Sequence, residues 1–172
     1  MIEFKKIEEN DFEMLYKWLN KDHVSKYFSH NTDSSFEEVC KKYRTRMLEE
    51  KMSMNLIIYN NLEIGYIQSY DCDYLDSFDL SESAIAVDLY IGEESYIHKG
   101  YGTKVLKEYI MSILSKQSHN WVVIDPDEDN IAAIKSYTKV GFRHVKTTLC
   151  TGCGKHNNYY MVLSRQDFFG KN

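Results

Sequence analysis

Asp88 is the residue whose surroundings point most directly to chemistry. It stands inside the apolar run 84–91, where Ala86 and Tyr90 are its neighbours on one face of a predicted strand. An unpaired carboxylate is costly to bury in such a strand. Asp88 therefore has two interpretations. It meets an amine in a cleft, as a base or an ammonium partner, or it belongs to a structural ion pair.

A pair of glycines, Gly100 and Gly102, follows this strand and precedes a helical pattern that extends to Leu114. Glycine lets backbone N–H groups approach a ligand with no Cβ in the way. The first N–H groups of a helix also carry partial positive charge. The pattern favours a pyrophosphate-binding turn, with an ordinary glycine turn as the alternative.

Two other nucleotide-binding motifs are excluded at this turn. The dinucleotide-binding pattern G-x-G-x-x-G fails because Val105 occupies the position of its third glycine. The P-loop pattern fails because Thr103 and Lys104 follow Gly102 in the wrong order. The turn is therefore neither of these two nucleotide sites.

Length and composition predict one soluble domain spanning residues 1–172. The chain is 43% hydrophobic and 27% charged, which is typical of globular proteins. No apolar run is long enough to cross a bilayer, and the N-terminus lacks the plan of a signal peptide. We therefore expect a cytoplasmic protein without membrane contact, in which the four cysteines stay reduced.

Acidic residues are concentrated around the Asp88 strand. The net charge of −5 argues against nucleic acid as a partner. Eight Asp or Glu and no Lys or Arg lie between Asp71 and Glu94, and a second acidic cluster occupies 125–129. Such clusters are often solvated loops. Beside a cleft they would concentrate a cationic substrate, so we expect a cationic small-molecule amine as the partner.

The remaining elements must position these groups, and their patterns predict a mixed α/β fold. In the first half we expect a strand at 2–7, a helix from Asn10 or Asp11 to about Asn20, a short helix or turn at 23–28, a helix from Thr32 or Asp33 to about Lys51 with Ser34 and Glu37 as a capping box, and a hairpin of 54–59 and 64–70. In the second half we expect a loop at 71–83, a strand at 121–124, a helix capped by Asp129 or Asn130 and ended by Gly141, and a hairpin of 142–150 and 159–164.

Two blocks of the chain resemble the GNAT superfamily of acetyl-CoA-dependent N-acetyltransferases. They are Asp88-x-x-Ile91 through Lys99-Gly100-Tyr101-Gly102-Thr103, and Asp125-Pro126-x-x-x-Asn130-x-x-Ala133-Ile134-x-x-Tyr137-x-x-x-Gly141-Phe142. Three shorter segments resemble one group within this superfamily, the aminoglycoside 6′-N-acetyltransferases. They are Trp18-Leu19-Asn20, Ile64-Gly65-Tyr66-x-Gln68-Ser69-Tyr70 and Val87-Asp88. The resemblance implies a central twisted mixed sheet of about seven strands flanked by helices, and acetyl-CoA as the co-substrate.

The resemblance also implies roles for individual residues. Asp88 and Tyr137 would be catalytic, and the Tyr137 phenol, with a pKa of about 10, can share a proton with a thiol of about 8.5. The implied coenzyme contacts are Leu89, Tyr90, Ile91, His98, Lys99, Gly100, Tyr101, Gly102, Thr103, Asn130, Ile134 and Tyr137. The implied substrate contacts are Asp88, Asp125 and Tyr70.

Alternatives remain at several of these positions. Tyr137 also fits a core aromatic on the helix face of Ile134, and Asp125 also fits a carboxylate that caps the turn at Pro126. Asn130 would cap its helix in either case. The superfamily usually has Arg or Gln and often Gly where this chain has Ile97 and His98. Backbone N–H groups do most of the phosphate binding, so we expect acetyl-CoA to bind.

The sequence leaves open other acceptor substrates, and a function without turnover. A polyamine, a siderophore amine or a protein N-terminus is an alternative acceptor, and a coenzyme A-binding module without turnover is an alternative function. Cys150 and Cys153 have the spacing of a zinc knuckle, but no second pair exists, so no metal is expected. We expect a monomer or a homodimer.

Overall fold

The computed structural model describes residues 1–28, 35–150 and 156–170. The chain divides into two compact units: residues 1–69 with 88–99, and residues 70–87 with 100–172. The described strands form a mixed seven-stranded sheet in the order β1-β2-β3-β4-β5-β7-β6. Strand β4 (Ala84–Ile91) passes from the second unit into the first at Asp88. The predicted mixed α/β class and the predicted sheet of about seven strands are confirmed; the single-domain assignment stays a prediction.

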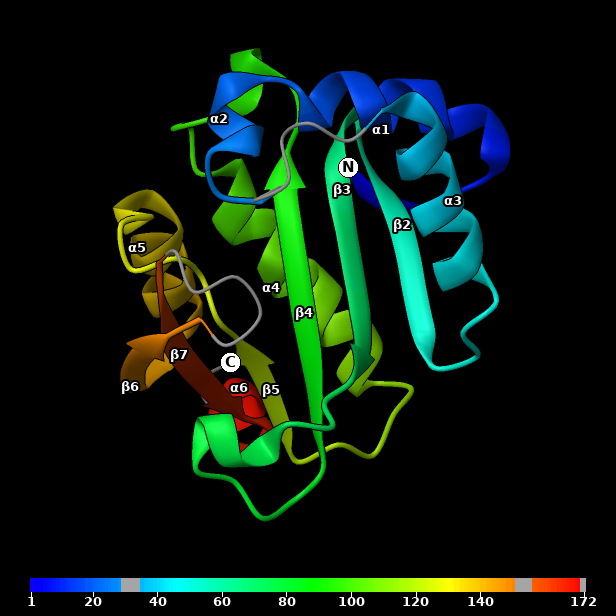
Figure 1. Cartoon of the computed structure of the whole chain (residues 1–172). Coiled ribbons are helices and arrows are strands. Elements are labelled where there is room, and N and C mark those ends of the chain that lie inside the picture. The colour runs from blue at the N-terminus through cyan, green and yellow to red at the C-terminus, as the bar shows by residue number, and fades with distance from the viewer. Residues whose placement is uncertain (29–34, 151–155, 171–172) are drawn as a thin grey trace. The chain divides into compact units, whose positions relative to one another are not determined.

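The first unit contains the N-terminal strands and the helices beside them (Figure 1). Its elements are β1 (Ile2–Lys6), the 3₁₀ helix η1 (Glu9–Asp11), α1 (Phe12–Leu19), α2 (Asp22–Ser25), α3 (Phe36–Met47), β2 (Met52–Tyr59), most of β3 (Leu62–Asp71), the end of β4 and the 3₁₀ helix η3 (Glu94–Tyr96). β1 pairs antiparallel with β2. Leu15, Trp18, Tyr43, Tyr66 and Tyr90 are among the side chains that form its core.

The second unit contains the remaining elements. They are η2 (Leu75–Phe78), the start of β4, α4 (Tyr101–Leu114), β5 (Trp121–Ile124), α5 (Ile131–Val140), β6 (Arg143–Leu149), β7 (Asn157–Ser164) and α6 (Arg165–Gly170). β4 runs parallel to β5, which is antiparallel to β7, and β7 is antiparallel to β6. Phe78, Ala86, Val123, Tyr160 and Val162 are among its core residues.

Local sequence signals account for the turn between β2 and β3 and for both ends of α5. Asn60 and Asn61 join β2 to β3 with φ of 48° and 65°, which is the backbone of a type I′ hairpin turn. Asn130 caps α5 by accepting a hydrogen bond from Ala133 N at 3.2 Å, and Gly141 ends that helix with φ of 122°. The predicted hairpin and the predicted helix cap are confirmed.

Both ends of α3 and two short helices differ from the predictions. Helix α3 begins after Ser35, whose hydroxyl pairs with Glu38 N, because the capping box lies one residue later than predicted; Thr32, Asp33 and Ser34 lie outside the described residues. The helix also ends at Met47 rather than near Lys51. The predicted loop contains η2, and α6 was not predicted.

Among the residues that the structure describes, no helix has the length and apolar character needed to span a membrane.

Candidate functional site

Asp88 lies in β4 and is half-buried. Its Oδ2 accepts a hydrogen bond from Gln68 Nε2 at 2.7 Å. Gln68 belongs to the neighbouring strand β3. Side chains alternate along a strand, so Gln68 shares its face with Tyr66, and Asp88 shares its face with Tyr90. The Asp88 carboxylate therefore has a hydrogen-bond partner from the next strand.

The side-chain oxygen of Gln68 accepts hydrogen bonds from two other residues. Its side chain is almost fully buried, with 3% of its surface exposed. Its Oε1 accepts hydrogen bonds from the Tyr66 hydroxyl at 2.8 Å and from Arg46 at 3.3 Å. Because arginine can only donate, the amide must present its oxygen to Arg46 and its nitrogen to Asp88. The orientation of the Gln68 amide is thus fixed.

Helix α3 brings positive charge near Asp88. Burial lowers the pKa of Lys42, the Arg46 charge lowers it further, and the Asp88 carboxylate raises it. Lys42 and Arg46 lie on the same face of α3, four residues apart. The effect of Asp88 on the Lys42 pKa places the Lys42 ammonium within electrostatic reach of the Asp88 carboxylate.

Three tyrosines form the buried wall beside Gln68. The rings of Tyr66 and Tyr90 stack with centroids 5.5 Å apart, and Tyr43 meets Tyr66 edge-on at 5.7 Å. Burial raises the pKa of Tyr43 to about 12 and that of Tyr90 well above its usual range. The Tyr43 and Tyr90 phenols therefore stay neutral near pH 7, and the wall serves as a rigid support for Gln68.

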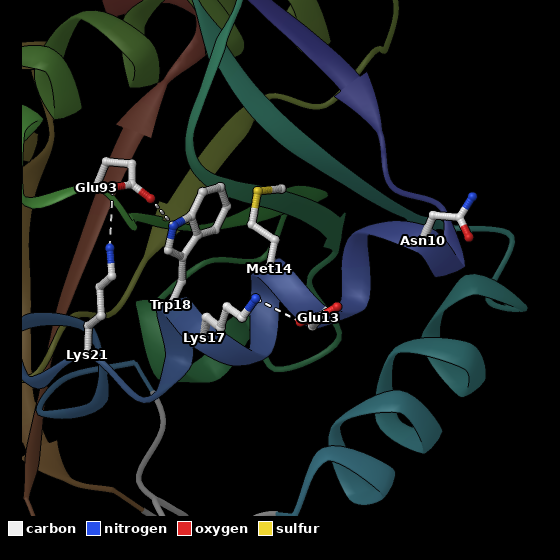
Figure 2. Close-up of a pocket in the computed structure, with 7 residues that line it drawn as sticks. All are labelled: Asn10, Glu13, Met14, Lys17, Trp18, Lys21 and Glu93. Carbon is white, nitrogen blue, oxygen red and sulfur yellow. Dashed lines mark hydrogen bonds and ion pairs between the residues drawn. The ribbon is translucent and has the colours of Figure 1, made fainter.

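Side chains from α1 and from the start of α2 hold the segment that follows β4. Trp18 Nε1 donates to Glu93 at 2.6 Å, and Lys21 contacts both Glu93 and the Gly92 carbonyl. A Cβ on Gly92 would lie 2.3 Å from the Trp18 ring. Figure 2 shows Trp18 and Lys21 pointing toward Glu93, and all three residues line one pocket. The volume of this pocket is about 330 Å³. None of the predicted site residues lines this pocket.

Residues predicted to contact the coenzyme include the last part of β4. Leu89 and Ile91 are half-buried and Tyr90 is buried. The Ile91 carbonyl lies 3.0 Å from His23 Nε2, which donates to it. A Cβ on Gly65 would lie 2.3 Å from the Tyr90 carbonyl. Gly65 therefore permits β3 to approach β4, which explains a glycine in the Ile64-Gly65-Tyr66 segment.

The glycine turn has the geometry of an anion-binding helix start. Gly100 precedes α4 with φ of 83°, and the first helical hydrogen bond runs from Lys104 N to the Gly100 carbonyl. No acid lies in the first turn of α4. A Cβ on Gly102 would meet nothing within 4 Å among the described atoms. The backbone conformation of Gly102 is one that other residues also adopt, so the conformation does not explain the glycine. The absence of a side chain leaves the start of α4 open to a ligand.

His98 occupies a strained position before this turn. Its φ is 57° and its side chain is exposed, as is that of Lys99. The left-handed conformation disfavours a residue with a Cβ. This is one of the two positions at which the sequence departs from the superfamily, which often has glycine there.

Helix α5 carries the second predicted catalytic residue, Tyr137. Its side chain is 8% exposed, and its ring lies 6.2 Å from that of Phe142. Ile134 on the same helix is half-buried, as are Tyr101 and Thr103 at the start of α4. The burial of Tyr137 is compatible with core packing, so its catalytic role stays a prediction.

The predicted substrate contacts Asp125 and Tyr70 are held by side chains of the second unit. Asp125 follows β5, is half-buried, and accepts a hydrogen bond from Asn158 on β7 at 3.0 Å. The hydroxyls of Tyr70 and Tyr74 are 3.1 Å apart. Asp125 thus has a carboxamide partner on a neighbouring strand, as Asp88 does.

The predicted site residues are divided between the two units. Those in the first unit are Asp88, Leu89, Tyr90, Ile91, His98 and Lys99. Those in the second are Tyr70, Gly100, Tyr101, Gly102, Thr103, Asp125, Asn130, Ile134 and Tyr137. The sequence did not reveal that Gln68 and Asn158 are the partners of the two carboxylates, or that Arg46 donates to Gln68. The signals for Gln68 were its place in the Ile64-Gly65-Tyr66-x-Gln68 segment and the strand face that it shares with Tyr66.

No group of three or more His, Cys, Asp or Glu in the described part of the chain could hold a metal. Cys150 is half-buried. Cys153 lies outside the described residues, so the predicted absence of a zinc knuckle stays a prediction.

Comparison with known proteins identifies the family. Residues 8–149 match the acetyltransferase (GNAT) domain model. The chain is 28% identical over 166 residues to aminoglycoside N(6′)-acetyltransferase type 1 of Klebsiella pneumoniae, covering 93% of this chain and 81% of the relative.

Solved structures of aminoglycoside acetyltransferases share the fold of this chain. The crystal structure of aminoglycoside acetyltransferase AAC(6′)-Ib with coenzyme A has a TM-score of 0.86 and 24% identity, covering 99% of this chain and 98% of that one. AAC(6′)-Ib with paromomycin and acetyl-CoA has a TM-score of 0.85 and 25% identity, covering 98% and 96%. The chain is therefore an acetyltransferase that belongs to the GNAT family.

Proposed function

We propose that this acetyltransferase moves the acetyl group of acetyl-CoA to a primary amine of a cationic small molecule, namely the 6′-amine of an aminoglycoside. The observation that carries the proposal is the match to an aminoglycoside N(6′)-acetyltransferase over 93% of the chain. The geometry around Asp88 supports it, because a carboxylate held by Gln68 at 2.7 Å suits a protonated amine.

Asp88 would act on the acceptor amine. An ammonium group has no lone pair to attack with, so it must lose a proton first. The Asp88 carboxylate would attract the ammonium, orient it, and take the proton. Acids elsewhere in the chain, including Asp125, would add attraction for a polycation.

The start of α4 would bind the coenzyme phosphates. The open backbone at Gly102 and the absence of an acid in the first turn of α4 fit an anion. When bound there, acetyl-CoA supplies the acetyl group as a thioester. Leu89, Tyr90 and Ile91 in β4 and Ile134 in α5 would line the rest of the coenzyme site, and Asn130 would join them beyond its cap.

Tyr137 would supply a proton to the thiolate of the departing coenzyme. A phenol has a pKa of about 10 and a thiol about 8.5, so the hydroxyl can share its proton with a thiolate. The buried side chain is shielded from solvent at 8% exposure, and bulk water is thereby a poorer proton donor at this position. We also propose that the enzyme acts in the cytoplasm, where acetyl-CoA is produced, as a monomer or a homodimer.

An acceptor panel tests the proposal. Release of coenzyme A thiol would be followed with acetyl-CoA and, separately, kanamycin, tobramycin, spermidine and a peptide with a free N-terminus. Turnover with the aminoglycosides, and a Michaelis constant for them that rises steeply with salt, is expected because attraction between exposed charges is screened over about 8–10 Å at ordinary ionic strength. Preference for spermidine or the peptide would move the function to another amine, and coenzyme binding without turnover on any acceptor would indicate a binding module.

A further inference from the structure

We propose that Gln68 is a positioning residue for the reaction, which fixes the direction and the charge of the Asp88 carboxylate through its side-chain amide. The inference rests on the proposed function, in which Asp88 handles the acceptor amine. It adds a residue that does not itself touch either substrate in the mechanism above. Its basis is the chain of hydrogen bonds that runs from Arg46 and Tyr66 through Gln68 to Asp88.

The amide of Gln68 has one possible orientation. Its oxygen accepts from the Tyr66 hydroxyl at 2.8 Å and from Arg46 at 3.3 Å. A flipped amide would place its NH₂ group against the guanidinium and its oxygen against the carboxylate, which would put two donors and then two acceptors face to face. Only the observed orientation directs Nε2 to Asp88 Oδ2, at 2.7 Å.

Burial makes this orientation persistent. Gln68 is 3% exposed and Tyr66 is fully buried. Tyr66 is in turn held by the stacked ring of Tyr90 and the edge of Tyr43. A buried polar group that lost its partner would cost about 1–3 kcal/mol. The network therefore has no low-cost alternative arrangement, and the donor to Asp88 stays in place between turnovers.

The consequence for Asp88 is twofold. The hydrogen bond at Oδ2 sets the direction in which the carboxylate faces the amine. It also favours the ionised carboxylate, because a donor stabilises the charged form. The other charged or titratable groups of this region are Lys42 and Arg46 on α3 and the phenols of Tyr43, Tyr66 and Tyr90. Gln68 links this wall to Asp88 through a hydrogen bond of defined geometry.

A double-mutant cycle tests the kinetic claim. Gln68→Met keeps the length of the side chain and removes the donor, and we expect it to lower kcat about 10–100-fold, as for a lost charge-assisted hydrogen bond, with the Michaelis constant for acetyl-CoA unchanged. Asp88→Asn combined with Gln68→Met should be no slower than Asp88→Asn alone, because Gln68 acts through Asp88. Losses that multiply instead would contradict the proposal.

Gln68→Glu adds a signature that simple packing damage cannot produce. An ionised glutamate at this position would repel Asp88, whereas a protonated one can donate to it. The activity of this variant relative to wild type should therefore increase as the pH falls. The matched control is Tyr43→Phe, which removes a buried hydroxyl of the same wall that makes no hydrogen bond to Gln68. It should leave kcat and the shape of the pH profile unchanged, and a pH-independent activity ratio for Gln68→Glu would contradict the inference.

A measurement without turnover separates this inference from the proposed function. In ¹⁵N NMR of the full chain, the side-chain NH₂ signals of Gln68 should shift strongly in Asp88→Asn and little in Asp125→Asn. If no amine is acetylated but these shifts occur, the hydrogen bond stands and the proposed function fails. If amines are acetylated but Asp88→Asn leaves the Gln68 side-chain signals unshifted, the positioning role is wrong.

Discussion

Two carboxylates of this protein are each held by a carboxamide on a neighbouring strand, but to different degrees. In the first unit Gln68 donates to Asp88 at 2.7 Å, and in the second Asn158 donates to Asp125 at 3.0 Å. Gln68 is buried and its oxygen is fixed by two donors. Asn158 is half-buried, and no described residue donates to its side-chain oxygen.

Under the proposed mechanism, this difference would separate a carboxylate that must be positioned, Asp88, from one that need only attract a cation, Asp125. A carboxylate that takes a proton has to keep its geometry to within a fraction of an ångström. A carboxylate that draws in a cation tolerates movement, because Coulomb attraction depends weakly on direction. We therefore expect changes at Asp88 to affect kcat and changes at Asp125 to affect the Michaelis constant of the acceptor.

The largest effect is expected for Asp88→Asn. Loss of a positioned base costs about 10²–10⁴ in rate, and asparagine keeps the shape while it removes the charge. Turnover of kanamycin should fall by that amount, with acetyl-CoA binding intact in a thermal melt. Residual activity should rise with pH as free amine becomes available. Near wild-type turnover would show that Asp88 is structural; if the variant does not fold, Asp88→Ser replaces it.

The second largest loss of turnover is expected for Tyr137→Phe. The hydroxyl matters when the thiolate leaves, so kcat should fall, by about 10²-fold at the lower end of general acid catalysis, more than the Michaelis constant for acetyl-CoA rises. Steady-state kinetics with varied acetyl-CoA measures both. Unchanged turnover with weakened binding would assign Tyr137 to packing against Phe142.

Asp125→Asn is the direct counterpart of Asp88→Asn. It should raise the Michaelis constant of kanamycin by about tenfold, the lower end for a lost charge-assisted contact of about 1.5–3 kcal/mol, and leave kcat nearly unchanged. Titration of kanamycin at saturating acetyl-CoA gives both constants. A loss of kcat as large as that of Asp88→Asn would remove the distinction between the two carboxylates.

Gly102→Val should abolish most of the thermal stabilisation by acetyl-CoA. A β-branched side chain would fill the open space at the helix start and block the phosphates. Gly102 is the better test, because Gly100 has φ of 83° and valine there would also strain the backbone. The melt without ligand is the control, and a ligand-induced shift equal to that of wild type would place the phosphates elsewhere.

The smallest effect is expected for His98→Gly, which should stabilise the protein, whereas the other substitutions impair it. It relieves the left-handed backbone at φ of 57°, and after the entropy cost of glycine a gain of about 0.5–1 kcal/mol remains. For a chain of this size that corresponds to a rise in Tm of about 1–4 °C. A lower Tm would show that the imidazole contributes more than its backbone strain costs.

Local features of the fold were predictable from the sequence because their signals lie close together in the chain. Asn60-Asn61 indicated the hairpin, Asn130 and Gly141 indicated the ends of α5, and Gly100 indicated the turn before α4. Each depends on backbone preferences of neighbouring residues. The role of the glycine turn in binding the coenzyme stays a prediction.

The partners of the carboxylates were not predictable in this way. Arg46, Gln68 and Asp88 come from α3, β3 and β4, and 22 and 20 residues separate the successive pairs. Which of several polar side chains meets Asp88 depends on the strand register and on how α3 packs, and neither is encoded locally. The position of the α3 capping box was missed by one residue because two serines stand side by side before the helix.

The central claim, transfer to a 6′-amine, is tested most directly with a matched pair of acceptors. The initial rate of coenzyme A thiol release by the wild-type enzyme would be measured with kanamycin and with an analogue that has a hydroxyl in place of the 6′-amine. We predict turnover of kanamycin, with the acetyl group on the 6′-nitrogen by NMR of the product, and almost none of the analogue. Equal rates on both compounds, or none on either beside rapid turnover of spermidine, would contradict the account.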